Sequence, residues 1–97
     1  MFEVSMVKID KDSFLGLRAE LPNSPPLLLI VGNKGFVMCG YLNMDAAERL
    51  GTVAAMVSGV KTIDDVLNAQ VRATTSKAKE LGIEPGAVVK NILGKLA

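Results

Sequence analysis

The sequence contains no histidine and no tryptophan, and only one of its 97 residues is a cysteine. The lack of histidine removes the commonest general base and the commonest neutral metal ligand, and it excludes every catalytic triad built on an imidazole. A single cysteine excludes an internal disulfide and is typical of a reducing compartment. The composition therefore indicates no catalytic residue, no metal site and no cofactor.

Long apolar runs are also lacking. Residues 25–31 form the longest wholly apolar run, which is far shorter than the roughly 20 residues that cross a bilayer. The first residues include an acid, Glu3, and lack the basic head of a secretory signal. Eleven basic residues offset ten acidic ones, so neither a strongly basic nor a strongly acidic surface is predicted. We therefore expect a cytoplasmic protein with no membrane partner.

Apolar residues are nevertheless abundant. They make up 49% of the chain, and the mean hydropathy is +0.35. A chain of this length forms a single domain with one modest core, because a small domain buries only about 64% of its extended-chain surface. The surplus predicts contact with further copies of the chain. We expect the first β-hairpin, whose strand edges need cover, to supply this contact.

Two β-hairpins are predicted in the first half of the chain. Apolar and polar residues alternate over 2–6, and the phase then slips at Val7, which indicates a strand with a bulge. A polar turn joins it to a second strand over 15–21, and a proline-rich loop over 22–26 follows. The apolar segments 27–31 and 36–42 form the second hairpin.

The remaining residues predict a strand–helix–strand unit and C-terminal helices. Asn43 is a plausible N-cap for a short helix that Gly51 ends, after which an apolar strand over 53–58 runs parallel to the strand over 36–42. Thr62 and Asp65 have the spacing of a capping box. The fold class is thus α/β (α+β), with a mixed sheet of about five strands covered by helices.

Two further features of the C-terminal third can be predicted. The helical pattern that starts at Thr62 contains polar and hydroxyl residues between Asn68 and Thr74, and we favour a break there. Pro85 suits the first turn of a final helix. The apolar stripe of that helix consists of Val88, Val89, Ile92, Leu93 and Leu96.

The lone thiol, Cys39, is one candidate functional group. In strand register it shares a face with Tyr41, and it lies at a strand end shortly before a helix start, an environment that can activate a thiol. The alternative is a structural residue, because free cysteines are often buried and behave as small hydrophobes. We keep Cys39 and Tyr41 as a candidate thiol or small-molecule site whose ligand the sequence does not specify.

Other motifs have simpler structural explanations. Gly59 precedes Lys61 and Thr62 as in part of a phosphate-binding loop, but the spacing is wrong and Asp65 places negative charge there, so ATP binding is not predicted. The turn around Gly35 joins two strands and opens no helix. The late Lys and Arg residues are interleaved with acids and have no aromatic neighbours, so nucleic-acid binding is the weakest hypothesis.

Three motifs together resemble those of the YunC-like family of small bacterial and archaeal proteins. They are Lys34-Gly35-Phe36-Val37-Met38-Cys39-Gly40-Tyr41-Leu42, Gly59-Val60-Lys61-Thr62-Ile63-Asp64-Asp65-Val66-Leu67 and Leu81-Gly82-Ile83. The family is a domain of unknown function. The resemblance implies an α/β subunit whose N-terminal β region, residues 1–31 here, assembles a homo-oligomer, a tetramer, while residues 32–97 form the α/β body. It carries over no activity. It also marks the motif glycines Gly35, Gly40 and Gly59 and the cap residues Thr62 and Asp65.

Overall fold

The computed structural model describes residues 2–40 and 43–97, and its strands form one mixed sheet in sequence order. The strands are β1 (Phe2–Ile9), β2 (Asp12–Leu21), β3 (Ser24–Val31), β4 (Phe36–Met38), β5 (Ala54–Met56) and β6 (Ala73–Thr74). Neighbours pair antiparallel except β4 and β5, which are parallel. The predicted α+β class with a mixed sheet is confirmed, with a sixth strand added.

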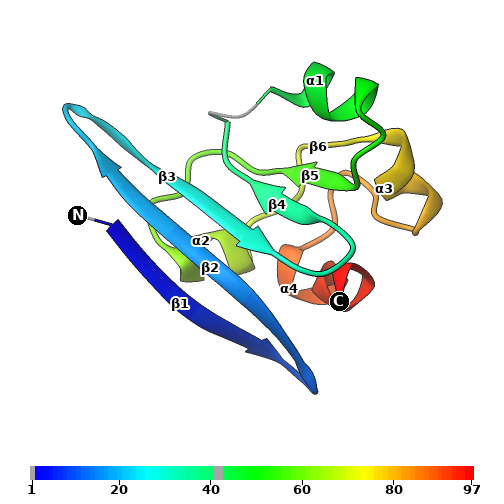
Figure 1. Ribbon diagram of the computed structural model, residues 1–97, viewed down its shortest axis with the longest axis horizontal. Coiled ribbons are helices and arrows are strands. Elements are labelled where there is room, and N and C mark those ends of the chain that lie inside the picture. The colour runs from blue at the N-terminus through cyan, green and yellow to red at the C-terminus, as the bar shows by residue number, and fades with distance from the viewer. Residues whose placement is uncertain (1, 41–42) are drawn as a thin grey trace.

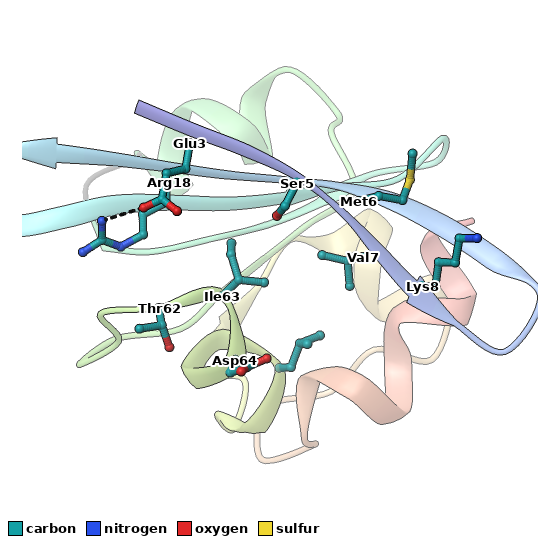
Figure 2. A pocket seen from close by; sticks show the side chains of 10 residues that line it. Glu3, Ser5, Met6, Val7, Lys8, Arg18, Thr62, Ile63 and Asp64 are labelled. Atoms are coloured by element: carbon teal, nitrogen blue, oxygen red, sulfur yellow. Dashed lines mark hydrogen bonds and ion pairs between the residues drawn. The ribbon is translucent and has the colours of Figure 1, made fainter. Parts of the chain in front are cut away.

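The first strand contains no bulge, so that prediction was wrong. Every residue of β1 pairs with β2 in one register, from Phe2 opposite Ala19 to Ile9 opposite Asp12. The phase slip has another cause, which is that β1 carries apolar side chains on both faces. Met6 points away from α2 (Ile63–Asn68) while Val7 points toward it (Figure 2), and only Val7 is buried.

The predicted proline-rich loop is much shorter than expected. The chain turns at Pro22 and Asn23, where Asn23 adopts a φ of 54°, and β3 begins at Ser24. Pro25 and Pro26 therefore lie inside a strand. They are tolerated there because the pairing of β2 with β3 is irregular at that point, and prolines fit strands where ladder hydrogen bonds are absent.

Five short helical segments lie among the described residues. They are α1 (Met44–Arg49), α2 (Ile63–Asn68), α3 (Ser76–Glu80), α4 (Val89–Ile92) and the 3₁₀ helix η1 (Leu93–Leu96). Their starts follow local chemistry: the Asn43 side chain accepts hydrogen bonds from the first turn of α1, and Thr62 and Asp65 form the predicted capping box of α2. Gly51 follows α1 with a φ of 71°, as expected of a helix stop.

The C-terminal third differs from its prediction at one point. The break after Asn68 is confirmed, and β6 occupies part of it. Pro85, however, does not begin a helix, because Gly86 has a φ of 96° and its N–H donates to Val71 O at 2.7 Å. The segment before α4 is thus paired in extended form with residues 70–71. The predicted stripe is buried in α4 and η1 at Val89, Ile92, Leu93 and Leu96.

The helices cover the two faces of the sheet unequally. On the inner face, α2, α4 and η1 pack against all strands from β1 to β5 around Phe14, Leu28 and Ile30. On the outer face, α1 packs near β4 and β5 through Met44 and Ala47. The long strands β1, β2 and β3 extend away from α1 and α3 (Figure 1), and this leaves the outer face of β1 and β2 exposed.

One carboxylate contact at the surface ties two helices together. Glu48 of α1 accepts a hydrogen bond on Oε1 from the backbone N–H of Ser76, at the start of α3, at 2.9 Å. This bond, aided by the Ser76 side chain and the charge of Lys79, holds the pKa of the Glu48 carboxyl below 4.5. The contact fixes α1 over the far end of the sheet.

Candidate functional site

Cys39 ends the hydrogen-bonded pairing of β3 with β4. Its N–H donates to Leu28 O at 3.2 Å, and its Sγ accepts the N–H of Leu28 at 3.4 Å. In a regular antiparallel pair that N–H would bond to the Cys39 carbonyl. The sulfur therefore satisfies a buried donor at the point where the ladder stops, and its side chain is 5% exposed.

A pocket opens immediately beyond this pair. Pro25 and Pro26 precede Leu28 and have no N–H, so β3 offers no donors from them to extend the ladder. On the other side of β4, Val57 N–H donates to Met38 O at 2.9 Å, and the strands then diverge. The resulting cavity of about 410 Å³ is lined by Pro25, Pro26, Cys39, Gly40, Ser58, Gly59, Val60 and Lys61.

The pocket brings together some of the residues predicted from sequence and not others. Cys39, Gly40 and Gly59 line it. Tyr41 lies outside the described residues, so the predicted pairing of Cys39 with Tyr41 stays a prediction. Gly35 lies at the other end of β4, where a Cβ would come within 2.2 Å of Val53 O.

The cap residues act on the backbone beside the pocket. The Asp65 carboxylate accepts the N–H groups of Lys61 and Thr62 at 3.1 and 3.2 Å, and Thr62 Oγ1 accepts the N–H of Asp65 at 3.0 Å. These donors are thus already used. These two N–H groups are therefore not available to a phosphate at the start of α2.

A second groove was not predicted from the sequence. It has a volume of about 550 Å³ and lies between β1 and α2, where Val7 and Ile63 point into the same space (Figure 2). Arg18 crosses one end: its guanidinium pairs with Glu3 at 3.2 Å and donates to Lys61 O at 2.9 Å. The groove joins strand and helix residues 45 or more positions apart, so no local pattern reveals it.

The outer face of β1 and β2 is the largest departure from ordinary burial. Phe2 is 65% exposed, Val4 58%, Met6 65% and Leu15 42%. Strand register places these side chains on one face, because Val4 lies opposite Leu17 and Met6 opposite Leu15.

Neither a cluster of metal-ligating side chains nor a membrane-spanning helix occurs among the described residues. Among residues 2–40 and 43–97, no three His, Cys, Asp or Glu side chains gather in a way that could hold a metal ion. Within the same ranges, no helix has the length and apolarity to span a membrane.

The geometry of Cys39 makes a prediction about stability. Cys39→Ala removes the sulfur and leaves the buried Leu28 N–H without its acceptor, so we expect a loss of about 1–3 kcal/mol in the free energy of unfolding. Cys39→Ser keeps an acceptor and should lose less. Urea denaturation of the two variants measures the difference. Equal stability of Cys39→Ala and wild type would show that the sulfur contributes nothing to the fold.

Comparison with known proteins finds relatives of the same size. A family described as "Domain of unknown function (DUF1805)" matches residues 38–96. The chain is 28% identical over 100 residues to "Uncharacterized protein YunC" of Bacillus subtilis (strain 168), covering 99% of this chain and 98% of that protein. It is also similar to the crystal structure of a protein of unknown function, TA1206 from Thermoplasma acidophilum, with a TM-score of 0.95, 40% identity, and coverage of 100% of this chain and 94% of that one.

Proposed function

The chain belongs to the DUF1805 family of unknown function, and from that premise we propose that it acts as the subunit of a homo-oligomer, a cytoplasmic tetramer held together by its N-terminal strands. The relatives confirm the YunC-like resemblance and are themselves uncharacterised, so no activity is assigned. The proposal is therefore argued from the surface of the chain.

The observation that carries it is the exposed apolar face of β1 and β2. Phe2, Val4 and Met6 alternate along β1 and stand beside Leu15 and Leu17 of β2. In a subunit that stayed alone, these positions would favour polar side chains, since one face of an antiparallel sheet ordinarily faces water. Contiguous apolar patches of this kind mark interaction sites.

The energy available is sufficient for association. Full burial of a Val, Met or Phe side chain contributes about 1.5–3 kcal/mol relative to full exposure. Phe2, Val4 and Met6 each keep more than half of their surface exposed. In a self-complementary contact both copies contribute these side chains, which can offset an association cost of about 4–15 kcal/mol.

The open edge of β1 supplies a second surface. β1 is the first strand of the sheet, and a two-residue turn closed by the pair Ile9 and Asp12 links it to β2. Alternate residues therefore direct N–H and C=O groups toward the unpaired edge. A long edge strand is a template for pairing with another chain. A tetramer with D2 symmetry needs two different self-complementary contacts per subunit, and β1 offers both a face and an edge.

Light scattering after gel filtration tests the proposal on the wild-type chain. At micromolar concentration we expect a single species with four times the 10.3 kDa mass of one chain. A species of twice that mass would exclude the tetramer. A stable species of 10.3 kDa would exclude the oligomer altogether.

A further inference from the structure

We infer that the pocket at the carboxyl ends of β4 and β5 binds a small molecule with an apolar body and a single carboxylate group. The pocket is formed within one chain, so this inference does not depend on the proposed oligomer. It concerns the cavity of about 410 Å³ between the start of β3 and the loop after β5. It assigns no covalent chemistry to the thiol.

The position of the pocket is one that sheets use for ligands. β4 and β5 are the one parallel pair of the sheet, and α1 and α2 lie on opposite faces of it. Open sheets with parallel strands bind ligands in the crevice beyond the carboxyl ends of strands where successive connections go to opposite faces. Cys39 follows β4 and Ser58 follows β5 closely, and both line this crevice.

The walls of the pocket favour an apolar body. Pro25 and Pro26 form one side, and the buried Cys39 and Val60 contribute further apolar surface. Most ligand pockets have this character, with a few polar groups that fix orientation. A Cβ built at Gly40 would meet no atom within 4 Å, so there is open space at that wall.

The residues that line the pocket include backbone donors and one cation. Within the described residues, the backbone N–H groups of Gly40, Ser58, Gly59 and Val60 have no hydrogen-bond partner. Lys61 is the one charged residue among those that line the cavity, and it forms no ion pair with the described residues. Donors without acceptors and a cation without an anion are complementary to a negatively charged group.

A carboxylate fits this arrangement better than a phosphate. Phosphate groups carry more charge and are commonly held by several cations or by the free donors of a helix start. Here the N–H groups of Lys61 and Thr62 are already taken by Asp65. The Asp65 carboxylate does not line the pocket. One lysine and a few backbone donors suit a single negative charge.

Nuclear magnetic resonance titration of the full chain with hexanoate tests the inference. We expect saturable shifts at millimolar hexanoate in the amide signals of Gly40, Gly59 and Val60. Hexanamide has the same body without the charge, and it should bind about tenfold more weakly, since hydrogen bonds to charged groups are the stronger ones. Inorganic phosphate should cause no saturable shift at these amides.

Three variants separate the contribution of the Lys61 charge from that of the open space beside Gly40. Lys61→Met should weaken hexanoate about tenfold and leave hexanamide unchanged, whereas Lys90→Met, on the exposed surface of α4, should change neither. Gly40→Leu fills the open wall and should abolish the binding of both probes. Lys61→Met is a surface change, so its result does not depend on how well Gly40→Leu folds.

Several outcomes would overturn the inference. Equal affinity for hexanoate and hexanamide would show that the pocket does not recognise the charge. An unchanged hexanoate affinity in Lys61→Met would remove the cation from the site. Shifts confined to Phe2, Val4 and Met6 would show that hexanoate adheres to the exposed sheet face instead. The absence of any saturable shift would show that no such site exists.

Discussion

Replacing Val4 and Leu15 together by lysine is expected to break the contact through the outer face of β1 and β2, so that the mass of the assembled protein falls to at most twice the 10.3 kDa of one chain. Both side chains are exposed in one subunit, so the substitutions should leave the subunit fold intact. In the assembly they would place four or more like charges in an apolar contact, and like-charge juxtaposition costs several kcal/mol. A loss of about 4 kcal/mol raises the dissociation constant roughly a thousandfold.

The matched control is Leu50→Lys. Leu50 is the most exposed large apolar residue of the described chain, at 80%, and it lies at the end of α1, away from β1. Light scattering of this variant should give the wild-type mass. If Val4→Lys/Leu15→Lys also keeps the wild-type mass, the outer face of β1 and β2 is not the contact between copies.

Gly35→Ala is expected to cause the largest loss of stability among the motif residues. A Cβ at position 35 would come within 2.2 Å of the carbonyl oxygen of Val53, which also accepts the Phe36 N–H at 3.1 Å. Relief of this clash must separate β4 from the segment leading into β5. Overpacking of this kind costs about 3 kcal/mol, which corresponds to a fall in Tm of at least roughly 10 °C in a domain of this size.

Gly40→Ala is the control for that substitution. Gly40 belongs to the same sequence motif, but a Cβ there would touch nothing within 4 Å, and its φ lies outside the left-handed region. We expect a change within about 0.5 kcal/mol. Calorimetry of both variants distinguishes the two glycines. Equal losses would mean that the motif glycines share a role unrelated to close backbone approach.

Local chemistry made much of the fold predictable. The Asn43 cap and the Thr62–Asp65 capping box depend on residues two or three positions apart, and both form as their spacing predicts. The hairpins and the break after Asn68 likewise follow from nearby turn and polar residues. The final helix was placed too early, because Gly86 and its pairing with Val71 decide the backbone there, and that contact spans 15 positions.

Periodicity failed where both faces of a strand are apolar. In β1 a change of phase at Val7 was interpreted as a bulge, but the register is continuous. Met6 and Val7 are adjacent and apolar because they lie on opposite faces of β1 and each face carries apolar side chains. Two successive apolar residues of this kind give the same sequence pattern as a bulge. The apolar residues on both faces of β1 therefore support the same proposal as the exposed face, which is that another copy of the chain covers the outer face of β1 and β2.

The candidate site was only partly predictable. The place of Cys39 at a strand end follows from the sequence. Its pocket does not, since the walls come from Pro25 and Pro26 and from residues 58–61, which meet only through the order of β3, β4 and β5. Sequence patterns report the period of one element, and they do not report which elements become neighbours.

Peroxide oxidation of Met6, followed by mass spectrometry, tests most directly whether the outer face is covered in the assembled protein. Met6 is exposed in one subunit, while Met38, at 1% exposure, provides a protected reference. We predict that Met6 oxidises slowly in the wild-type protein, at a rate close to that of Met38, and rapidly in Val4→Lys/Leu15→Lys. Rapid oxidation of Met6 at the same rate in both proteins would contradict the account.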